Sequence, residues 1–236
     1  MTRWSAGLGS VMAALAIATP AHAATLSRSG SKVIFAAAAG EQNTPQVMTS
    51  NGNILINDGN DVRTGPGCTT DAMSAATGCS LAGVTKVIFR LGDLDDELRL
   101  GDNELRTKAQ FQVDGGAGKD HLRGTKRNDV LLGGAGADSI DGTAGKDKIN
   151  GGSGNDDVTG FGTIYGGAGN DILRMLNHFA GVRHFPSRVF GGAGNDEILV
   201  GNGVRDVVDC GSGKDRATTS DKRGLDRFSR NCEGAH

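Results

Sequence analysis

Five nonapeptides follow one another without interruption between Gly115 and Thr159, and this period constrains the fold more than any other feature of the chain. They read GGAGKDHLR, GTKRNDVLL, GGAGADSID, GTAGKDKIN and GGSGNDDVT. Each has Asp at its sixth position and an apolar residue at its eighth. A flexible glycine-rich linker is the main alternative, but a linker has no reason to keep an acid and an aliphatic side chain in register. The period therefore predicts a repeated structural unit.

The composition of one nonapeptide predicts a turn followed by a very short strand. Glycine at positions one, two and four permits backbone conformations with positive φ and turns carbonyl oxygens toward the space between neighbouring turns. The last three residues are polar, apolar and polar, which favours a strand with one side chain directed inward. Two nonapeptides then close one rung of a solenoid, and rungs stack at roughly 4.8 Å. Asp120 and Asp138 should therefore lie on neighbouring rungs.

These turns are rich in oxygen, which indicates a hard cation. The Asp at position six adds a carboxylate to the carbonyl oxygens of the glycine-rich turn. Hard, anionic ligands that are flexible in number suit Ca²⁺ better than Mg²⁺ or zinc. Glycine supplies 39 of the 236 residues and aromatic residues only 4%, so a thick globular core is not expected.

The pattern resembles the RTX, or haemolysin-type, calcium-binding repeat, which forms a parallel β-roll. The resemblance covers Gly115–Thr159 and recurs at Gly166–Arg174, Gly191–Leu199 and Cys210–Thr218. It implies an all-β fold, a parallel β-roll or β-solenoid, with Ca²⁺ held by the sixth-position aspartates and by carbonyls of the glycine-rich turns. The implied ligands are Asp120, Asp129, Asp138, Asp147, Asp156, Asp171, Asp196 and Asp215, together with Gly116, Gly118, Gly134, Gly136, Gly152, Gly154, Gly167, Gly169, Gly192 and Gly194.

The two edges of the expected roll differ. If two turns share each rung, one edge carries the turns that have glycine at both the second and the fourth position, and we name it the glycine edge. Its sixth-position residues are Asp120, Asp138, Asp156, Asp171, Asp196 and Asp215. On the opposite edge only Asp129 and Asp147 are acidic and one rung apart, and Arg127 crowds the first of these turns. We therefore expect metal along the glycine edge, a weaker site at Asp129 and Asp147, and little or none at Asp206.

Residues 24–112 lack the complete repeats, and we expect them to form a strand-rich N-terminal region with a cysteine loop. The expected strands, separated by polar and glycine-containing turns, are Lys32–Ala36, Gln46–Ser50, Asn53–Asn57 and Lys86–Leu91. The segment Leu91–Arg99 is a degenerate repeat, with Asp96 in the sixth place but Leu94 where the fourth glycine belongs. The β-roll is expected over 113–218 and a C-terminal cap over 219–236.

The chain has four cysteines, an even number that fits an oxidising compartment. Three pairings are open, and we favour the two sequence-local ones, Cys68–Cys79 and Cys210–Cys232. The second would tie the last two rungs together and cap the open end of the solenoid, because a bare strand edge invites pairing with another molecule. A zinc site of four thiolates is the alternative, but the sequence contains no CxxC unit.

Residues 1–23 have the pattern of a secretory signal. Arg3 supplies a basic start, residues 8–18 form a short apolar run, and residues 21–23 form a small-residue cleavage site. We expect the mature chain to start at Ala24 and the protein to be secreted and extracellular. The alternative is an uncleaved membrane anchor, although the apolar run is short for a span, and no later segment is apolar enough.

The segment Met175–Phe190 replaces a turn of the opposite edge with apolar and basic residues. One interpretation is a recognition loop that bulges from the solenoid and binds a cell-surface or glycan partner. The other is a loop folded back over apolar rungs. Its two histidines are six residues apart, which is not a recognised metal spacing.

Catalytic signatures are absent from the sequence. HExxH and GxSxG do not occur, which argues against a zinc protease and a lipase. The formal net charge is -2 and no basic stripe with interleaved aromatics is present, so we expect no nucleic-acid partner. We expect a calcium-binding structural or interaction module that is not an enzyme. The alternatives are a surface adhesin and a polysaccharide-active solenoid enzyme.

Overall fold

The computed structural model describes residues 24–59, 62–70, 76–101, 105, 107–176, 185–221 and 225–234. Every regular element in these residues is a β-strand, which confirms the all-β fold class. The described part contains no helix long and apolar enough to cross a membrane. The expected signal segment, residues 1–23, and residues 177–184 lie outside the described residues.

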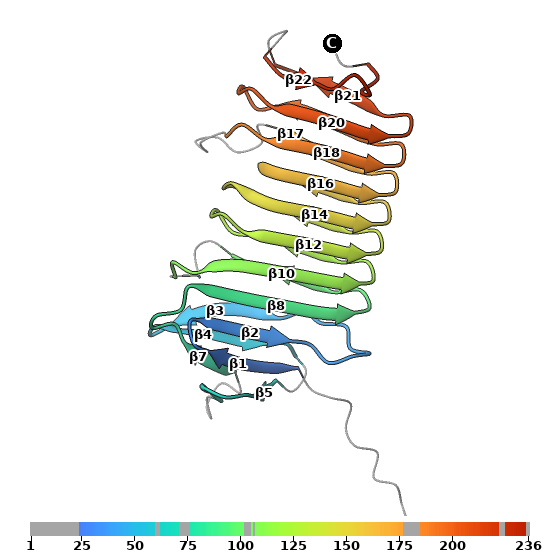
Figure 1. The fold of residues 1–236 in the computed structure, drawn as a ribbon. Helices are drawn as coiled ribbons and strands as arrows, with labels where there is room; N and C mark the ends of the chain where they lie inside the picture. Colours follow the sequence, from blue (N-terminus) through green and yellow to red (C-terminus); the bar gives the residue numbers. More distant parts are fainter. Residues whose placement is uncertain are drawn as a thin grey trace, which may run out of the picture.

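Two parallel sheets form the faces of a roll in which successive strands stack along one axis (Figure 1). The long strands of one sheet are β8 (Lys86–Asp93), β10 (Gln110–Ala117), β12 (Val130–Ala135), β14 (Asp147–Ser153), β16 (Gly162–Ala168), β18 (Arg188–Ala193) and β20 (Val207–Ser212). The shorter strands of the other sheet are β9 (Glu97–Arg99), β11 (His121–Arg123), β13 (Ser139–Asp141), β15 (Asp157–Thr159), β17 (Ile172–Leu176), β19 (Glu197–Gly201) and β21 (Arg216–Thr219). One long strand and the short strand after it make a rung. The expected parallel β-roll is therefore confirmed.

The register of the long strands confirms that two nonapeptides close one rung. Gly116 pairs with Gly134, and Gly134 pairs with Gly152. The shortened turn at 160–165 makes the next rung smaller, so that Gly152 pairs with Gly167. The insertion makes the following rung larger, so that Gly167 pairs with Gly192. Changes in length are thus absorbed on the opposite edge, and the glycine-rich turns stay aligned.

The core of the roll is a thin column of aliphatic side chains. The eighth-position residues of the short strands are buried, and they are Leu122, Ile140, Val158, Leu173 and Ile198. The long strands β12, β14, β16, β18 and β20 each bury one aliphatic residue, and these are Leu131, Ile149, Ile164, Val189 and Val208. One buried aliphatic side chain contributes about 1.5–3 kcal/mol, whereas ordering one residue costs about 1–2 kcal/mol of backbone entropy. This column alone is too thin to hold a nine-residue unit in place.

The N-terminal region continues the first sheet and adds a third one. The strands β1 (Thr25–Ser29) and β2 (Lys32–Ala36) form an antiparallel hairpin, and β2 pairs in parallel with β8. At the outer end, β5 (Arg63–Thr64) pairs with β1. The third sheet is antiparallel, and its strands in order are β3 (Gln46–Ser50), β4 (Asn53–Asn57), β7 (Thr77–Ser80) and β6 (Cys68–Thr70).

The sequence predicted three of these strands with the bounds that the structure has: β2, β3 and β4. The fourth expected strand is confirmed as β8, which continues to Asp93. Residue 112, where the N-terminal region was expected to end, lies inside β10. The division into regions at that residue stays a prediction.

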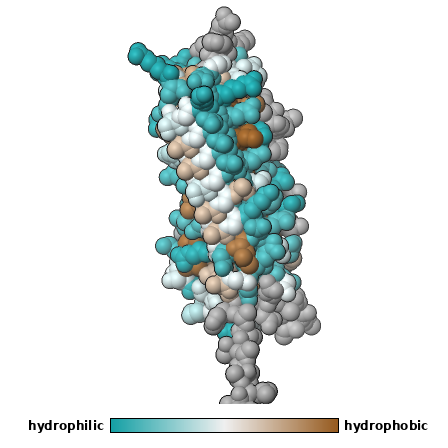
Figure 2. Space-filling model, turned by 90° about the vertical axis from the view of Figure 1, so that its right-hand side faces the viewer, coloured by the Kyte–Doolittle hydropathy of each residue, from teal (hydrophilic) through white to brown (hydrophobic). Residues whose placement is uncertain are grey.

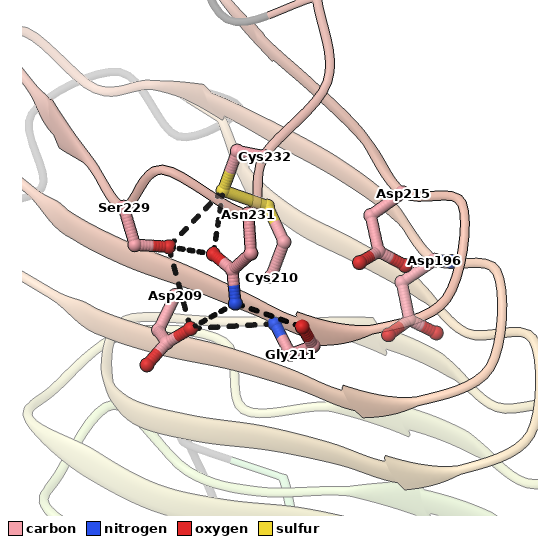
Figure 3. The surroundings of a disulfide bond; sticks show 8 residues. All are labelled: Asp196, Asp209, Cys210, Gly211, Asp215, Ser229, Asn231 and Cys232. Carbon is pink, nitrogen blue, oxygen red and sulfur yellow. Dashed lines mark hydrogen bonds between the residues drawn. A yellow bond between two sulfur atoms is a disulfide. The ribbon is translucent and has the colours of Figure 1, made fainter.

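Both expected disulfides are confirmed. Cys68 and Cys79 are directly paired residues of β6 and β7, with Cα atoms 4.4 Å apart. The Cα atoms of Cys210 and Cys232 are 5.2 Å apart. Figure 3 shows that this second bridge attaches the segment around Cys232 to β20, and the side-chain amide of Asn231 donates to the Gly211 carbonyl and to Oδ1 of Asp209, each over 2.8 Å. The competing zinc site is therefore ruled out.

The bounds expected for the insertion were wrong. Met175 and Leu176 belong to β17 and pair with Val200 and Gly201 of β19. At the other end, β18 begins at Arg188. Hydrogen bonding to the next rung continues the strands past the point where the nonapeptide pattern ends, and Met175 is fully buried. The segment that leaves the two sheets is therefore shorter than Met175–Phe190.

Candidate metal-binding edge

The sixth-position aspartates of the glycine edge form a continuous hydrogen-bonded row. The backbone N–H of Asp120 donates to Oδ1 of Asp138 over 2.8 Å, and the N–H of Asp138 donates to Oδ1 of Asp156 over 2.8 Å. The same contact continues through Asp171, Asp196 and Asp215 at 2.9, 2.9 and 3.0 Å. The structure thus brings together all the aspartates predicted for this edge. In Figure 2 this edge faces the viewer as a pale band that runs along the roll between hydrophilic borders.

The second oxygen of each carboxylate in this row is buried without a partner. Oδ2 of Asp120, Asp138, Asp156, Asp171, Asp196 and Asp215 has no hydrogen-bond partner among the described residues. A buried, unpaired carboxylate oxygen is costly, and native proteins seldom leave one unsatisfied. A row of such atoms in equivalent places therefore fits a bound cation better than an accident of packing.

Backbone carbonyl oxygens are packed into the same spaces, which we call gaps: the spaces between consecutive turns of the glycine edge. A Cβ atom built on Gly134 would lie 2.0 Å from the Gly116 oxygen, and one built on Gly136 would lie 1.9 Å from the Gly118 oxygen. A Cβ on Gly115 would lie 2.3 Å from Oδ2 of Asp120. Glycine is required because carbonyl and carboxylate oxygens occupy the volume that a side chain would need.

Burial makes these carboxylates hard to ionise in the absence of a cation. Burial, partly offset by the hydrogen-bonding N–H groups and reinforced by neighbouring carboxylates of the row, raises the pKa of Asp120, Asp156 and Asp171 to about 6. Burial also raises the pKa of Asp138 and Asp196. A divalent cation in each gap would reverse this penalty, because it favours the ionised form.

On the opposite edge, the equivalent aspartates Asp129 and Asp147 make only one such hydrogen bond. The N–H of Asp129 donates to Oδ1 of Asp147 over 2.9 Å, whereas the N–H of Asp147 donates to the carbonyl of Phe161. This confirms that Asp129 and Asp147 lie one rung apart. Burial raises the pKa of Asp147 to about 8, and it also raises that of Asp129 although the Arg127 cation lowers the latter. The nearby cation supports the expectation of a weaker site.

The expectation that Asp129 and Asp147 are the only acidic neighbours on the opposite edge was wrong. The N–H of Asp206 donates to Oδ1 of Asp226 over 3.0 Å, since β22 (Arg227–Phe228) pairs with β20 and carries Asp226 into the next rung. In the other direction Oδ1 of Asp206 accepts the N–H of Ser187, so no acid precedes it. The turn before Asp206 has Asn202 and Val204 where the turns of the glycine edge have their second and fourth glycines, and neither residue has positive φ, so this turn differs from those of the glycine edge.

Sequence reasoning also left Asp96 out of the ligand set, although the structure places it in the row. Its N–H donates to Oδ1 of Asp120 over 2.9 Å. The signal was present in the sequence, because Asp96 is the sixth residue of the degenerate repeat. Because leucine replaces the fourth glycine of this repeat, Asp96 was not recognised as equivalent to the sixth-position aspartates of the complete repeats.

The end of the insertion contacts the opposite edge. The Lys146 ammonium lies 4.8 Å from the centroid of the Phe185 ring. Next to it, Oγ of Ser187 accepts the N–H of Gly162 over 3.1 Å. The part with the two histidines lies outside the described residues, so the choice between a recognition loop and a cover stays open.

Among the described residues, no three His, Cys, Asp or Glu side chains are grouped so that they could hold a metal by themselves. A cation on the glycine edge must therefore take carbonyl oxygens as well as carboxylates. That mixture of hard oxygen ligands suits Ca²⁺.

Comparison with known protein families gives one match. The model of the RTX calcium-binding nonapeptide repeat matches four copies, at residues 114–147, 132–162, 159–174 and 187–207. Searches of curated proteins and of solved structures give no significant match. RTX nonapeptide repeats bind Ca²⁺. The repeats at residues 114–174 and 187–207 of this β-roll are RTX calcium-binding nonapeptide repeats.

Proposed function

We propose that the protein is a secreted calcium-binding module whose roll folds as Ca²⁺ enters the gaps of the glycine edge. Its role is structural or interactive and not enzymatic. The observation that carries the proposal is the row of buried Oδ2 atoms without hydrogen-bond partners among the described residues. A carbonyl oxygen of the next turn is close to several of these atoms: a Cβ built on Gly115 would lie 2.3 Å from Oδ2 of Asp120 and 2.6 Å from the Gly133 oxygen.

The ligands follow from the row. Each gap has an aspartate from each of its two rungs, and the carbonyls of the glycines at positions two and four contribute the remaining oxygens. An interior aspartate such as Asp138 borders two gaps and serves two ions. Asp129 and Asp147 share one further, weaker ion, because the Arg127 cation opposes it. When bound, the metal supplies positive charge that allows the buried carboxylates to ionise.

Export would move the chain from surroundings poor in calcium to surroundings rich in it, which fits folding that depends on calcium. Two disulfides fit an oxidising compartment, and the segment 1–23 has the pattern of a signal peptide. Extracellular calcium modules bind at about 10⁻⁴–10⁻³ M. The roll would stay unfolded where calcium is scarce and would fold outside the cell.

Circular dichroism of the secreted chain tests this proposal. With a chelator the repeat segment should be largely disordered, and calcium should restore the strand signal at millimolar concentration. Magnesium at the same concentration is the control and should have little effect, because it demands a stricter octahedral geometry. A strand signal that is the same with chelator and with calcium would refute the proposal.

A surface adhesin remains the second candidate, and one observation favours it. The ring of Tyr165 in β16, which is 45% exposed, stacks on that of Phe190, its cross-strand partner in β18, with centroids 4.8 Å apart. Exposed aromatic pairs are common at binding surfaces. Cell walls and glycans can be incubated with the wild type and with Tyr165→Ser, with and without calcium. Calcium-dependent binding that the substitution weakens supports adhesion, and equal retention of both proteins contradicts it.

A further inference from the structure

The row of the glycine edge extends beyond the first complete nonapeptide. The Asp96 N–H donates to Oδ1 of Asp120 just as the Asp120 N–H donates to Oδ1 of Asp138, at 2.9 and 2.8 Å. Asp96 is 1% exposed, and its Oδ2 has no hydrogen-bond partner in the described part of the chain. The gap between the β8–β9 turn and the β10–β11 turn is therefore flanked by a carboxylate on each rung.

The carbonyls of the β8–β9 turn take the same places as those of the repeats. A Cβ built on Gly116 would lie 2.0 Å from the Gly92 oxygen, and one built on Gly118 would lie 2.0 Å from the Leu94 oxygen. The corresponding distances one rung further on are 2.0 and 1.9 Å. This gap contains the oxygen set of a repeat gap, although the segment before residue 114 lies outside the family match.

Leu94 keeps its carbonyl in the row at a conformational cost. Its φ is 70°, a left-handed value that side chains disfavour, and its side chain is 49% exposed. Burial of the leucine therefore does not account for the conformation. The conformation does give the carbonyl the position that Gly118 has in the next turn.

Asn43 ends the row and links it to the N-terminal region. Its backbone N–H donates to Oδ1 of Asp96 over 2.6 Å, and its carbonyl accepts the Glu97 N–H over 2.9 Å. It occupies the place of one more aspartate but is neutral. On that side a Cβ on Gly92 would find no atom closer than 3.8 Å, so no packed carbonyls follow.

We propose that Gly92, Leu94 and Asp96 form an additional calcium site with the turn that ends at Asp120, and that the ion in this gap fastens the N-terminal region to the roll. The inference rests on the proposed function, since it needs calcium in the equivalent gaps of the repeats. It extends calcium binding to a turn in which leucine replaces the fourth glycine.

A matched pair of substitutions tests the site by equilibrium dialysis with metal analysis. Asp96→Asn removes a charge from this gap and should lower the number of bound calcium ions by about one. Asp95→Asn is the control, because Oδ1 of Asp95 accepts the Lys119 N–H over 2.7 Å and Asn preserves this contact. The control should bind as many ions as the wild type. Asp138 borders two gaps, so Asp138→Asn should bind about two calcium ions fewer than the wild type.

The outcomes separate this inference from the proposed function. If Asp96→Asn and Asp95→Asn bind equal numbers of ions while Asp138→Asn loses ions, the additional site is refuted and the proposed function stands. If Asp138→Asn loses none, the proposed function itself fails. Hydrogen exchange of the Asn43 amide adds a second readout. Calcium should protect it in Asp95→Asn much more than in Asp96→Asn.

Leu94→Gly keeps the test decisive if Asp96→Asn does not fold. Glycine adopts the left-handed conformation without strain and leaves the carbonyl in place. We expect Leu94→Gly to bind as many calcium ions as the wild type. The calcium concentration that gives half-maximal protection of the Asn43 amide should be several-fold lower than in the wild type. An unchanged midpoint for this amide would overturn the inference.

Discussion

Replacing Asp156 by Asn should have opposite effects on stability without and with calcium. Asn has nearly the same shape, and its Oδ1 still accepts the Asp138 N–H that Asp156 accepts over 2.8 Å. The substitution therefore removes the charge and leaves the hydrogen-bonded row intact. We expect the variant roll to be more stable than the wild type in chelator and to gain less stability when calcium is added.

The magnitude follows from burial and from the two gaps that this residue borders. Burial raises the pKa of Asp156 from 3.8 to about 6, so at neutral pH its ionised form costs about 3 kcal/mol more in the folded than in the unfolded chain. Asn carries no such cost. Calcium at 10 mM and a Kd of about 10⁻⁴–10⁻³ M contribute about 1.4–2.7 kcal/mol per site. Losing two sites removes about 3–5 kcal/mol of that gain.

The assay compares folding of the wild type and Asp156→Asn under two conditions. In chelator the roll is refolded with trimethylamine oxide, which favours compact states. The variant should need less of it than the wild type. In calcium, urea titrations should give the variant a distinctly smaller calcium-dependent increase in the free energy of unfolding. A variant that needs more osmolyte in chelator, or that keeps the full calcium increment, would refute the reasoning.

Three further predictions concern glycine packing, pH and the C-terminal cap. In thermal melts with calcium, Gly152→Ala should lower stability by several kcal/mol more than Gly203→Ala. Both glycines have positive φ, but only a Cβ on Gly152 would lie 2.0 Å from a carbonyl oxygen. Equal losses of stability would contradict a packing requirement for glycine. In chelator, the stability of the roll should rise as pH falls from 7 to about 4, because the aspartates of the row bind protons more tightly in the folded chain. In calcium, stability should instead fall over the same range, because protons compete with the metal for the carboxylates. Circular dichroism at each pH would show the two trends, and parallel trends would contradict this prediction. Replacing both Cys210 and Cys232 by Ser should lower stability by about 3 kcal/mol and raise hydrogen exchange in β20 and β21 first, and uniform exchange along the roll would argue against a capping role.

The fold could be predicted from the sequence where the pattern is periodic. Nine-residue spacing places acids and aliphatic residues in register, so the row from Asp120 to Asp215 and the stacking of rungs followed from it. The short runs rich in apolar residues that form β2, β3 and β4 were also sufficient, since polar and glycine-containing turns separate them. The strands β5, β6 and β22 were not predicted because they are two or three residues long and mostly exposed. The strands β1 and β7 were also not predicted, because TLSRS and TGCS contain too few apolar residues to indicate a strand.

What could not be predicted depended on contacts between distant segments. Asp226 enters the opposite edge because β22 pairs with β20 twenty residues earlier, and no repeat marks that pairing. Asn43 reaches the row because a turn of the N-terminal region hydrogen-bonds to Asp96, 53 residues away. Leu94 adopts a left-handed backbone conformation, with a φ of 70°, that is unfavourable for leucine. Local propensity carries no information about any of these contacts.

Anomalous diffraction from crystals grown in calcium would locate each calcium ion bound along the roll. We expect one strong peak in every gap of the glycine edge from Asp96 to Asp215, a weaker peak between Asp129 and Asp147, and little or no density beside Asp206. Absence of peaks on the glycine edge, or peaks of equal strength beside Asp206, would contradict this expectation.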